Sequence, residues 1–208
     1  MIDMITAFTL IVLFLSIIIH ELAHGSVALH LGDQTAKEAG RLTLNPLKHI
    51  DPFGTILFPL ILLVFTMGRG PIIGWAKPVP INPFNFRDQK WGLLKVSIAG
   101  PSVNFLLGII FGLFIRFFQL PESLLMIFSI IVVYNFAWGL FNLIPLPPFD
   151  GSHILFTFLP KSFSYLKNFL HQYGLFILIF FIFLGGLNLI FLGAYFLFSL
   201  ICGQPLAI

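Results

Sequence analysis

Long apolar runs separated by short polar stretches dominate this sequence. The runs at 5–31, 91–118 and 123–143 can each cross a hydrocarbon core of about 30 Å as a helix, at about 1.5 Å of rise per residue. A last run at 174–202 contains a Gly-Gly pair at 185–186, so it is predicted either as one tilted helix or as a tight hairpin. The pattern therefore predicts an all-α polytopic membrane protein built as a helical bundle.

The stretch between the first two long runs predicts less regular structure. Residues 41–45 alternate polar and apolar side chains, which is typical of a short β-strand or hairpin, before Pro46 ends the pattern. Residues 53–67 are apolar but contain a proline and are short for a full crossing, which favours a re-entrant or interfacial segment. Residues 68–87 are rich in Gly and Pro and are predicted to form an extended, structured loop.

The composition agrees with this architecture. Hydrophobic residues make up 58% of the 208 residues, charged residues only 9%, and the mean hydropathy is +1.01, which lies outside the range of soluble domains. We expect a single membrane-embedded domain over residues 1–208, with a C-terminal apolar segment at 172–203. The lone Cys202 cannot form an internal disulfide, and the small net charge of +3 offers no basic face for nucleic acid.

The distribution of Lys and Arg predicts the orientation of the chain in the membrane. If residues 53–67 do not cross, ten of the eleven basic residues lie in loops on one side, and Arg116 alone lies opposite. The positive-inside rule places the ten on the cytoplasmic face. The first apolar run then ends at that face near Gly32, and we expect the active site of this cell-membrane protein to open toward the cytoplasm.

An ionisable motif interrupts the first apolar run. His20 and His24 are four residues apart and project from one face of a helix, so both imidazoles can bind a single metal ion. Glu21 is turned by about 100° around the helix and stays close enough to act on a water molecule at that ion. The alternative is a hydrogen-bonded buried pair of histidines, in which the buried Glu21 would need a partner of its own.

A catalytic zinc site needs three protein ligands and one open position, so a third ligand must come from elsewhere in the chain. Asp150 is the best candidate because it follows a Pro-rich break, and irregular backbone at membrane depth is tolerated only inside protein or beside a water-filled cavity. The alternative for Asp150 is a simple Asp-Gly turn. Zinc is favoured over other divalent ions by ligand type.

Other polar side chains in the apolar runs have open roles. Asn142 either donates to an oxyanion or binds backbone carbonyls freed by the prolines. Asn104, within a stripe of small residues, either forms hydrogen bonds between helices or holds the substrate backbone near the metal. His153 could support Asp150 or replace it as a ligand. His49 lies in a polar loop and is expected to be solvated or interfacial.

Together these motifs resemble those of the site-2 protease family of intramembrane zinc metalloproteases. The resemblance depends on the motif at 20–24, on Gly-Pro-Ser-Val-Asn at 100–104 and on the Pro-rich segment at 142–151. It covers residues 5–155, which we take as the core of the domain, and is strongest to small prokaryotic members without a PDZ domain.

The resemblance implies a specific site and activity. It implies one zinc ion per chain, held by His20, His24 and Asp150, with Glu21 as the general base and with Asn142 and Asn104 near the substrate. The implied partners are the lipid bilayer and a transmembrane protein or peptide, which is cleaved within or near its membrane segment.

A mechanism and its rivals follow from the residues themselves. Because a helical substrate hides its carbonyl groups, we expect it to unwind and to pair with a strand at 41–45 by edge addition. A membrane metal-ion transporter is the main alternative function, since ionisable residues in lipid also mark ion pathways. A catalytically inactive membrane scaffold is the second alternative.

Overall fold

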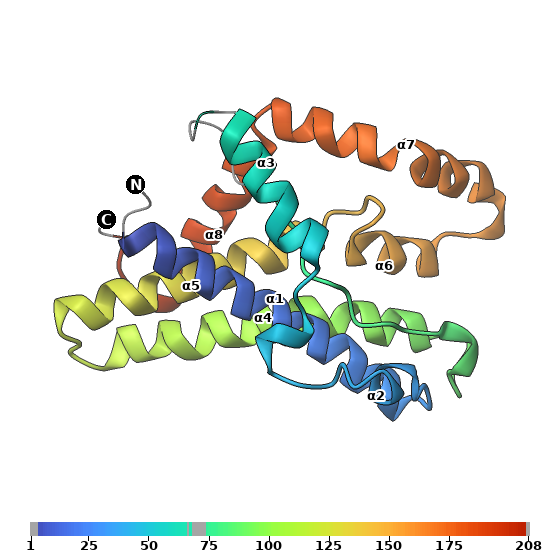
Figure 1. The fold of residues 1–208 in the computed structure, drawn as a ribbon, viewed down its shortest axis with the longest axis horizontal. Helices are drawn as coiled ribbons and strands as arrows, with labels where there is room; N and C mark the ends of the chain where they lie inside the picture. The colour runs from blue at the N-terminus through green and yellow to red at the C-terminus, as the bar shows by residue number, and fades with distance from the viewer. Residues whose placement is uncertain (1–3, 66, 68–73, 207–208) are drawn as a thin grey trace.

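All regular secondary structure in the part of the chain that the structure describes is helical, and this part comprises residues 4–65, 67 and 74–206 of a computed structural model (Figure 1). Four of these helices are long and apolar enough to cross a membrane, as expected for a multi-pass membrane protein. They are α1 (Met4–His30), α4 (Gly92–Phe117), α5 (Glu122–Asn142) and α7 (Ser164–Phe183). The predicted all-helical class is therefore confirmed.

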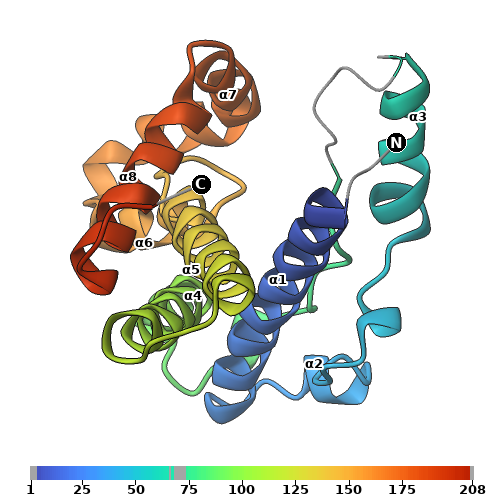
Figure 2. The same ribbon diagram turned by 90° about the vertical axis from the view of Figure 1, so that its left-hand side faces the viewer.

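The centre of the molecule is a bundle in which α1 packs against α4 and α5. Figure 2 shows α1 between the α4–α5 pair and α3 (Phe58–Phe65). Small residues on α4 allow this packing, because a Cβ at Gly108 would lie 2.5 Å from the ring of Phe136 on α5. The last helix, α8 (Gly186–Cys202), covers the other side of α4 and α5 and completes the apolar core with Ala194 and Phe198.

The predicted strand at 41–45 is wrong. Within the described residues this segment is irregular and lies between α2 (Thr35–Glu38) and a 3-10 turn, η1 (Pro46–Lys48). Its polar groups have other partners: the Thr43 carbonyl accepts from His49 Nε2, and the Asn45 side chain caps η1. The alternation does not mark an apolar face, because the polar Arg41 is buried and the apolar Leu44 is exposed, and the described residues contain no strand that pairs with this segment.

The apolar segment that follows forms a short helical arm, a π-helical turn η2 (Pro52–Leu57) continued by α3. Its fourteen helical residues would span about 21 Å at 1.5 Å per residue, less than a hydrocarbon core of about 30 Å. The described residues form one helical path rather than a path in and out, so the predicted re-entrant segment is not supported. Part of this prediction, at residue 66, lies outside the described residues.

The predicted loop at 68–87 is irregular where it is described. Residues 74–82 have no regular structure, and a 3-10 turn, η3 (Pro83–Asn85), leads into α4. Residues 68–73 lie outside the described part of the chain. Trp75 anchors the loop to the arm, since its backbone N–H donates to the Gly54 carbonyl and its ring nitrogen donates to Asp51.

The C-terminal region folds back on the bundle. After α5, a Pro-rich turn with a cis Pro147–Pro148 peptide bond leads into α6 (Asp150–Phe158), which packs against α4. A 3-10 turn, η4 (Lys161–Phe163), precedes α7. The final apolar run is divided at Gly185, whose φ of +85° is accessible to glycine, so it forms two helices rather than one.

Candidate metal centre

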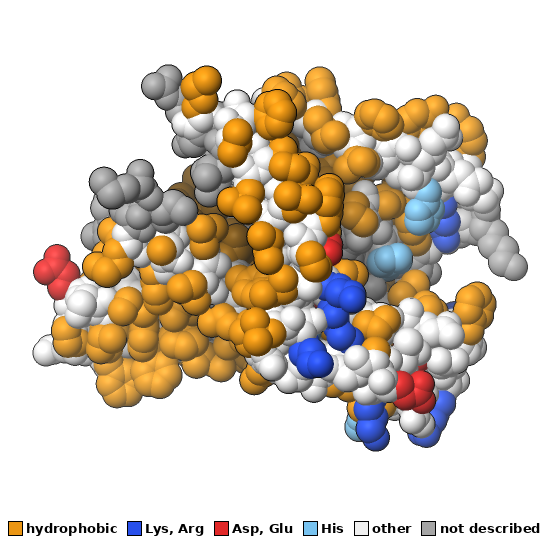
Figure 3. Space-filling model, in the orientation of Figure 1, with side chains coloured by type: hydrophobic (Ala, Val, Ile, Leu, Met, Phe, Trp, Pro, Cys, Tyr) orange, Lys and Arg blue, Asp and Glu red, His pale blue; other side chains and the backbone are white. Residues whose placement is uncertain are grey.

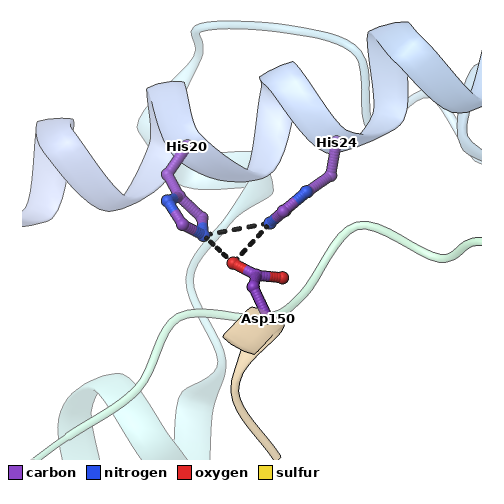
Figure 4. A group of neighbouring side chains, drawn as sticks. All are labelled: His20, His24 and Asp150. Carbon is purple, nitrogen blue, oxygen red and sulfur yellow. Dashed lines mark hydrogen bonds and ion pairs between the residues drawn. The ribbon is translucent and has the colours of Figure 1, made fainter. Parts of the chain in front are cut away.

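His20 and His24 lie one turn apart on the buried face of α1. Their side chains point toward a single position beside α6, as Figure 4 shows. The two Nε2 atoms are 3.0 Å apart, and the rings are nearly perpendicular, with an interplanar angle of 88°. Only 2% of His20 and 6% of His24 is exposed. The two imidazoles therefore meet inside the bundle, as their spacing predicts.

Asp150 reaches the same position from the first residue of α6. Its Oδ2 lies 3.1 Å from Nε2 of His20 and 3.3 Å from Nε2 of His24 (Figure 4). The Pro-rich turn that brings it there is tight at Gly151, where a Cβ would collide with the carbonyl oxygen of Leu143. The turn after α5 therefore delivers a carboxylate from a residue 126 positions beyond His24, and it requires glycine beside it.

The hydrogen bonds on the far side of each ring determine which nitrogen carries a proton. His24 Nδ1 lies 2.7 Å from the Val96 carbonyl of α4, which can only accept, so Nδ1 donates. His20 Nδ1 lies 2.7 Å from Oδ1 of Asn104, whose own Nδ2 donates to Asn135 and to the Ser16 carbonyl. Each neutral imidazole therefore presents the lone pair of its Nε2 to the other and to Asp150.

Three acceptor atoms thus converge in a buried position. The two Nε2 atoms and Asp150 Oδ2 all lie within 4.8 Å of one another, and Oδ2 is buried without a hydrogen-bond donor of suitable geometry. Such atoms repel one another unless a cation lies between them. Neighbouring ligands on a tetrahedral zinc ion with bonds of 2.0–2.1 Å are about 3.3 Å apart. The observed separations of 3.0–3.3 Å fit this ion.

Gly100 of α4 makes room for this centre. A Cβ at this position would lie 2.5 Å from His24 Nε2 and 2.6 Å from His20 Nε2. Atoms do not approach this closely without displacement, so no larger side chain fits while the imidazoles keep their places. The small-residue stripe on α4 therefore serves the metal centre as well as the packing of helices.

Glu21 follows His20 directly in the chain, and its side chain is held by a loop outside the helical bundle. Its Oε2 accepts a hydrogen bond of 2.9 Å from the backbone N–H of Val79, in the irregular loop after the arm. This bond uses one carboxylate oxygen and leaves Oε1 for another partner. The side chain is therefore beside two candidate ligands and has a fixed anchor that belongs to neither α1 nor α4.

The remaining predicted residues are placed differently. Asn104 is fully buried, and both ends of its amide are engaged with His20, Asn135 and the Ser16 carbonyl. Asn142 is buried at the end of α5 and donates to the Trp138 carbonyl one turn earlier. Among the described residues, His153 does not belong to the group of possible metal ligands.

Several contributing residues were not singled out from the sequence. Asn135 supports Asn104, and the Trp138 ring packs edge-on against His20 at 6.2 Å between centroids. Asn135 could have been found from the sequence, because it lies seven residues before Asn142 and so shares a face with it on the otherwise apolar α5. His49, expected to be solvated or interfacial, is fully buried within the protein, so it is not solvated.

Comparison with known proteins identifies relatives over most of the chain. Peptidase family M50 matches residues 118–185, which include Asp150. A putative zinc metalloprotease YwhC of Bacillus subtilis is 41% identical over 165 residues, which cover 74% of this chain and 70% of that protein.

Two further relatives are more distant and longer. Zinc metalloprotease MJ0392 of Methanocaldococcus jannaschii is 32% identical over 76% of this chain and 36% of its own length. A putative zinc metalloprotease Rip2 of Mycolicibacterium smegmatis is 29% identical over 66% of this chain and 51% of its own length. The chain thus spans about a third to a half of the length of these two proteins. No solved structure matched.

The relatives and the centre point to the same chemistry, since a buried His-His-Asp group suits zinc and a glutamate adjoins it. The family that the motifs resemble is thereby confirmed, and neither a transporter nor an inactive scaffold is favoured. The chain belongs to peptidase family M50, the site-2 protease family of intramembrane zinc metalloproteases.

Proposed function

We propose that this protein hydrolyses a peptide bond within or near a transmembrane segment of another membrane protein, with His20, His24 and Asp150 as zinc ligands and Glu21 as the general base. The observation that carries the proposal is the convergence of three lone-pair atoms within 4.8 Å in the bundle, with Glu21 next to His20 in the chain. Three protein ligands leave one coordination position for reactants, as in other catalytic zinc sites.

The residues have distinct roles in this mechanism. Zinc, when bound, supplies Lewis acidity that polarises the peptide carbonyl and makes a nearby water a stronger acid. Glu21 accepts a proton from the attacking water through its Oε1 and later returns it to the leaving amine. Asn104 and the Val96 carbonyl hold the Nδ1 protons and so keep both Nε2 lone pairs directed at the ion.

Asn142 remains a predicted substrate contact in this proposal. Its Nδ2 donates to the Trp138 carbonyl, and its Oδ1 has no intramolecular hydrogen bond among the described contacts. Asn142 lies in the last turn of α5, just before the turn that presents Asp150. That location suits a side chain that orients the backbone of an unwound substrate.

The proposal includes an orientation in the membrane. With ten basic residues on one side, we propose that α1 ends at the cytoplasmic face and that the active site opens there. The distribution of charge in Figure 3 supports this, since basic side chains gather over α2 and the loops near the end of α1, while the described surface at the opposite end shows mainly apolar side chains and no Lys or Arg on this face. We further propose that residues 1–208 act as a single membrane-embedded domain, with its catalytic core in residues 5–155.

The decisive experiment compares Glu21→Gln with the unchanged protein in proteoliposomes that contain a single-pass test substrate. Removing the general base is expected to reduce cleavage by about 10²- to 10⁴-fold, while the bound zinc remains near one ion per chain. Glu38→Gln, the same change at an exposed position on α2, is the matched control and should cleave normally. Normal cleavage by Glu21→Gln would reject the role of Glu21, and a protein that binds no zinc would reject the whole proposal.

A further inference from the structure

A second set of buried charged residues surrounds the loop that anchors Glu21. We call residues 76–82 the strap, because this irregular segment runs from Trp75 past α1 to η3. Val79, at its middle, is buried against α1, where a Cβ at Gly25 would lie 2.8 Å from its side chain. The strap is therefore in direct contact with the helix turn that carries Glu21 and His24.

Arg41 holds the first half of the strap. Its side chain is buried, and its Nη2 donates to the carbonyl oxygens of Lys77 at 2.6 Å and Pro78 at 3.3 Å. The Lys77 N–H in turn donates to the carbonyl of the fully buried His49 at 2.9 Å. The backbone on either side of the Lys77–Pro78 bond is therefore fixed by contacts from the segment between α2 and the arm.

Asp33 holds the other end of the strap. This fully buried carboxylate accepts from the Asn82 backbone N–H at 2.7 Å and from the Asn85 side chain at 2.8 Å, and it also binds Thr35. Neither Asp33 nor Arg41 takes part in an ion pair within the described part of the chain. Both charges are instead buried against backbone and polar groups of this loop, whose hydrogen bonds offset part of the cost of burial.

The middle of the strap, residues 78–80, contains one backbone donor. Residues 78–80 read Pro-Val-Pro, and proline has no N–H, so Val79 supplies the single N–H of these three residues. The prolines also restrict φ on both sides of Val79. That one N–H donates to Glu21 Oε2 at 2.9 Å. The contact is therefore selective, and its position depends on where Arg41 and Asp33 hold the strap.

We propose that Arg41 and Asp33 are positioning residues for Glu21, acting through the strap and the Val79 N–H. The inference rests on the proposed role of Glu21 and extends it to side chains that touch neither the zinc ligands nor the substrate. Fixing Oε2 limits the rotation of the carboxylate and leaves Oε1 to accept the proton of the reacting water. A displacement of about 1 Å at such a group can reduce turnover by about 10²-fold.

The first experiment measures kcat, KM and zinc content for Arg41→Ala, Arg41→Lys and Asp33→Asn in the full chain. We expect kcat to fall by about tenfold in Arg41→Ala, while KM and zinc content change by about twofold at most, because positioning affects the reaction rather than binding. Arg41→Lys should recover part of kcat, since an ammonium can still donate to one carbonyl. Lys37→Ala, which removes an exposed cation from α2, is the control.

The second experiment removes the donor itself. Val79→Pro deletes the N–H in an irregular segment already bounded by prolines, whereas Val79→Ala keeps the N–H and removes the two γ carbons. The inference expects Val79→Pro to have at least about fivefold lower kcat than Val79→Ala at equal zinc content. This pair decides the question if Arg41→Ala does not fold. Equal kcat values in the pair would overturn the inference.

A double-mutant cycle separates this inference from the proposed function. In the Glu21→Gln background, Arg41→Ala should lower the residual rate by about twofold at most, because the group that it positions is already gone. Independent, multiplicative losses would mean that the strap serves general stability and would overturn the inference. If Glu21→Gln cleaves normally, the proposed role of Glu21 is rejected. If Glu21→Gln is impaired but Arg41→Ala and Val79→Pro are not, only the role of the strap is rejected.

Discussion

The two proposed histidine ligands and the proposed general base are neighbours in the chain, but two different kinds of structure hold them. His20 and His24 are fixed by groups on α4, the Asn104 amide and the Val96 carbonyl, within a packed bundle. Glu21 is fixed by one backbone N–H of an irregular strap. Packed helices hold the two proposed ligands in a rigid geometry, whereas the proposed base is held by a segment whose own position, in our inference, depends on buried charges.

Removal of a proposed zinc ligand is expected to have the largest effect, because it takes away one of the groups that the helical bundle holds at the metal position. Asp150→Ala leaves two imidazoles and should lower zinc affinity by more than about 100-fold, with no detectable cleavage. Zinc retained after dialysis and the cleavage rate are the measurements. Asp88→Ala, which removes an exposed partner of Lys95, should leave both unchanged. Stoichiometric zinc in Asp150→Ala would mean that another residue is the third ligand.

Crowding the centre from α4 should have the next largest effect. In Gly100→Ala the new Cβ would lie 2.5–2.6 Å from the imidazole nitrogens, so at least one ring must move. We expect zinc affinity to fall by about 100-fold, which is the upper end of the loss seen when groups that orient metal ligands are mutated. Gly193→Ala on α8 is the matched control, since its Cβ would meet only the flexible end of Leu140 at 3.1 Å. Equal zinc affinity in the two variants would contradict the crowding.

Removal of the hydrogen-bond partner of His20 is expected to lower zinc affinity less than removal of a ligand. Asn104→Ala leaves the His20 Nδ1 proton and the Asn135 Oδ1 without their partner, and the imidazole gains rotational freedom. A loss of about tenfold in zinc affinity is expected, the lower range for groups that orient metal ligands. Asn188→Ala on α8 is the control. A change in KM alone, with normal zinc affinity, would instead favour the predicted role of Asn104 in substrate binding.

Protonation of Asp33 in acid should weaken its hold on the strap, and this effect on stability is the smallest of those expected. Burial raises the pKa of Asp33, but hydrogen bonds from Thr35, Asn82 and Asn85 outweigh it and hold the pKa below its ordinary value. A lowered pKa in the folded state means that the carboxylate stabilises the fold above its unfolded-state pKa, near 4, and that this contribution is lost as pH falls further.

Thermal unfolding of the unchanged protein and of Asp33→Asn, measured in detergent from pH 7 to pH 3, checks this sign. The unchanged protein should unfold a few degrees higher at neutral pH, and the two unfolding temperatures should converge below about pH 4. Asp88→Asn at the surface should show a smaller difference throughout. A difference that grows toward acid pH would contradict the assignment of Asp33.

The sequence predicted the parts of this protein that depend on local periodicity. The i, i+4 spacing of His20 and His24 fixes their common direction on any helix, and long apolar runs can satisfy their backbone in a membrane only as helices. Asp150 was also predicted, because a Pro-rich break at membrane depth must lie inside protein or beside a water-filled cavity, where a carboxylate can serve as a ligand. These inferences need only neighbours along the chain.

The predictions that failed or were incomplete depend on contacts between distant segments. The alternation at 41–45 predicted a strand, but a strand needs a partner, and Arg41 is instead buried where it binds the strap 36 residues away. Asn104 was left with two roles until its contact with His20, 84 residues away, was located. The sequence by itself therefore determined the helices and the ligand types, while only the tertiary structure decided which groups hold the ligands and the base, because hydrogen-bond partners across the bundle are set by packing and not by spacing in the chain.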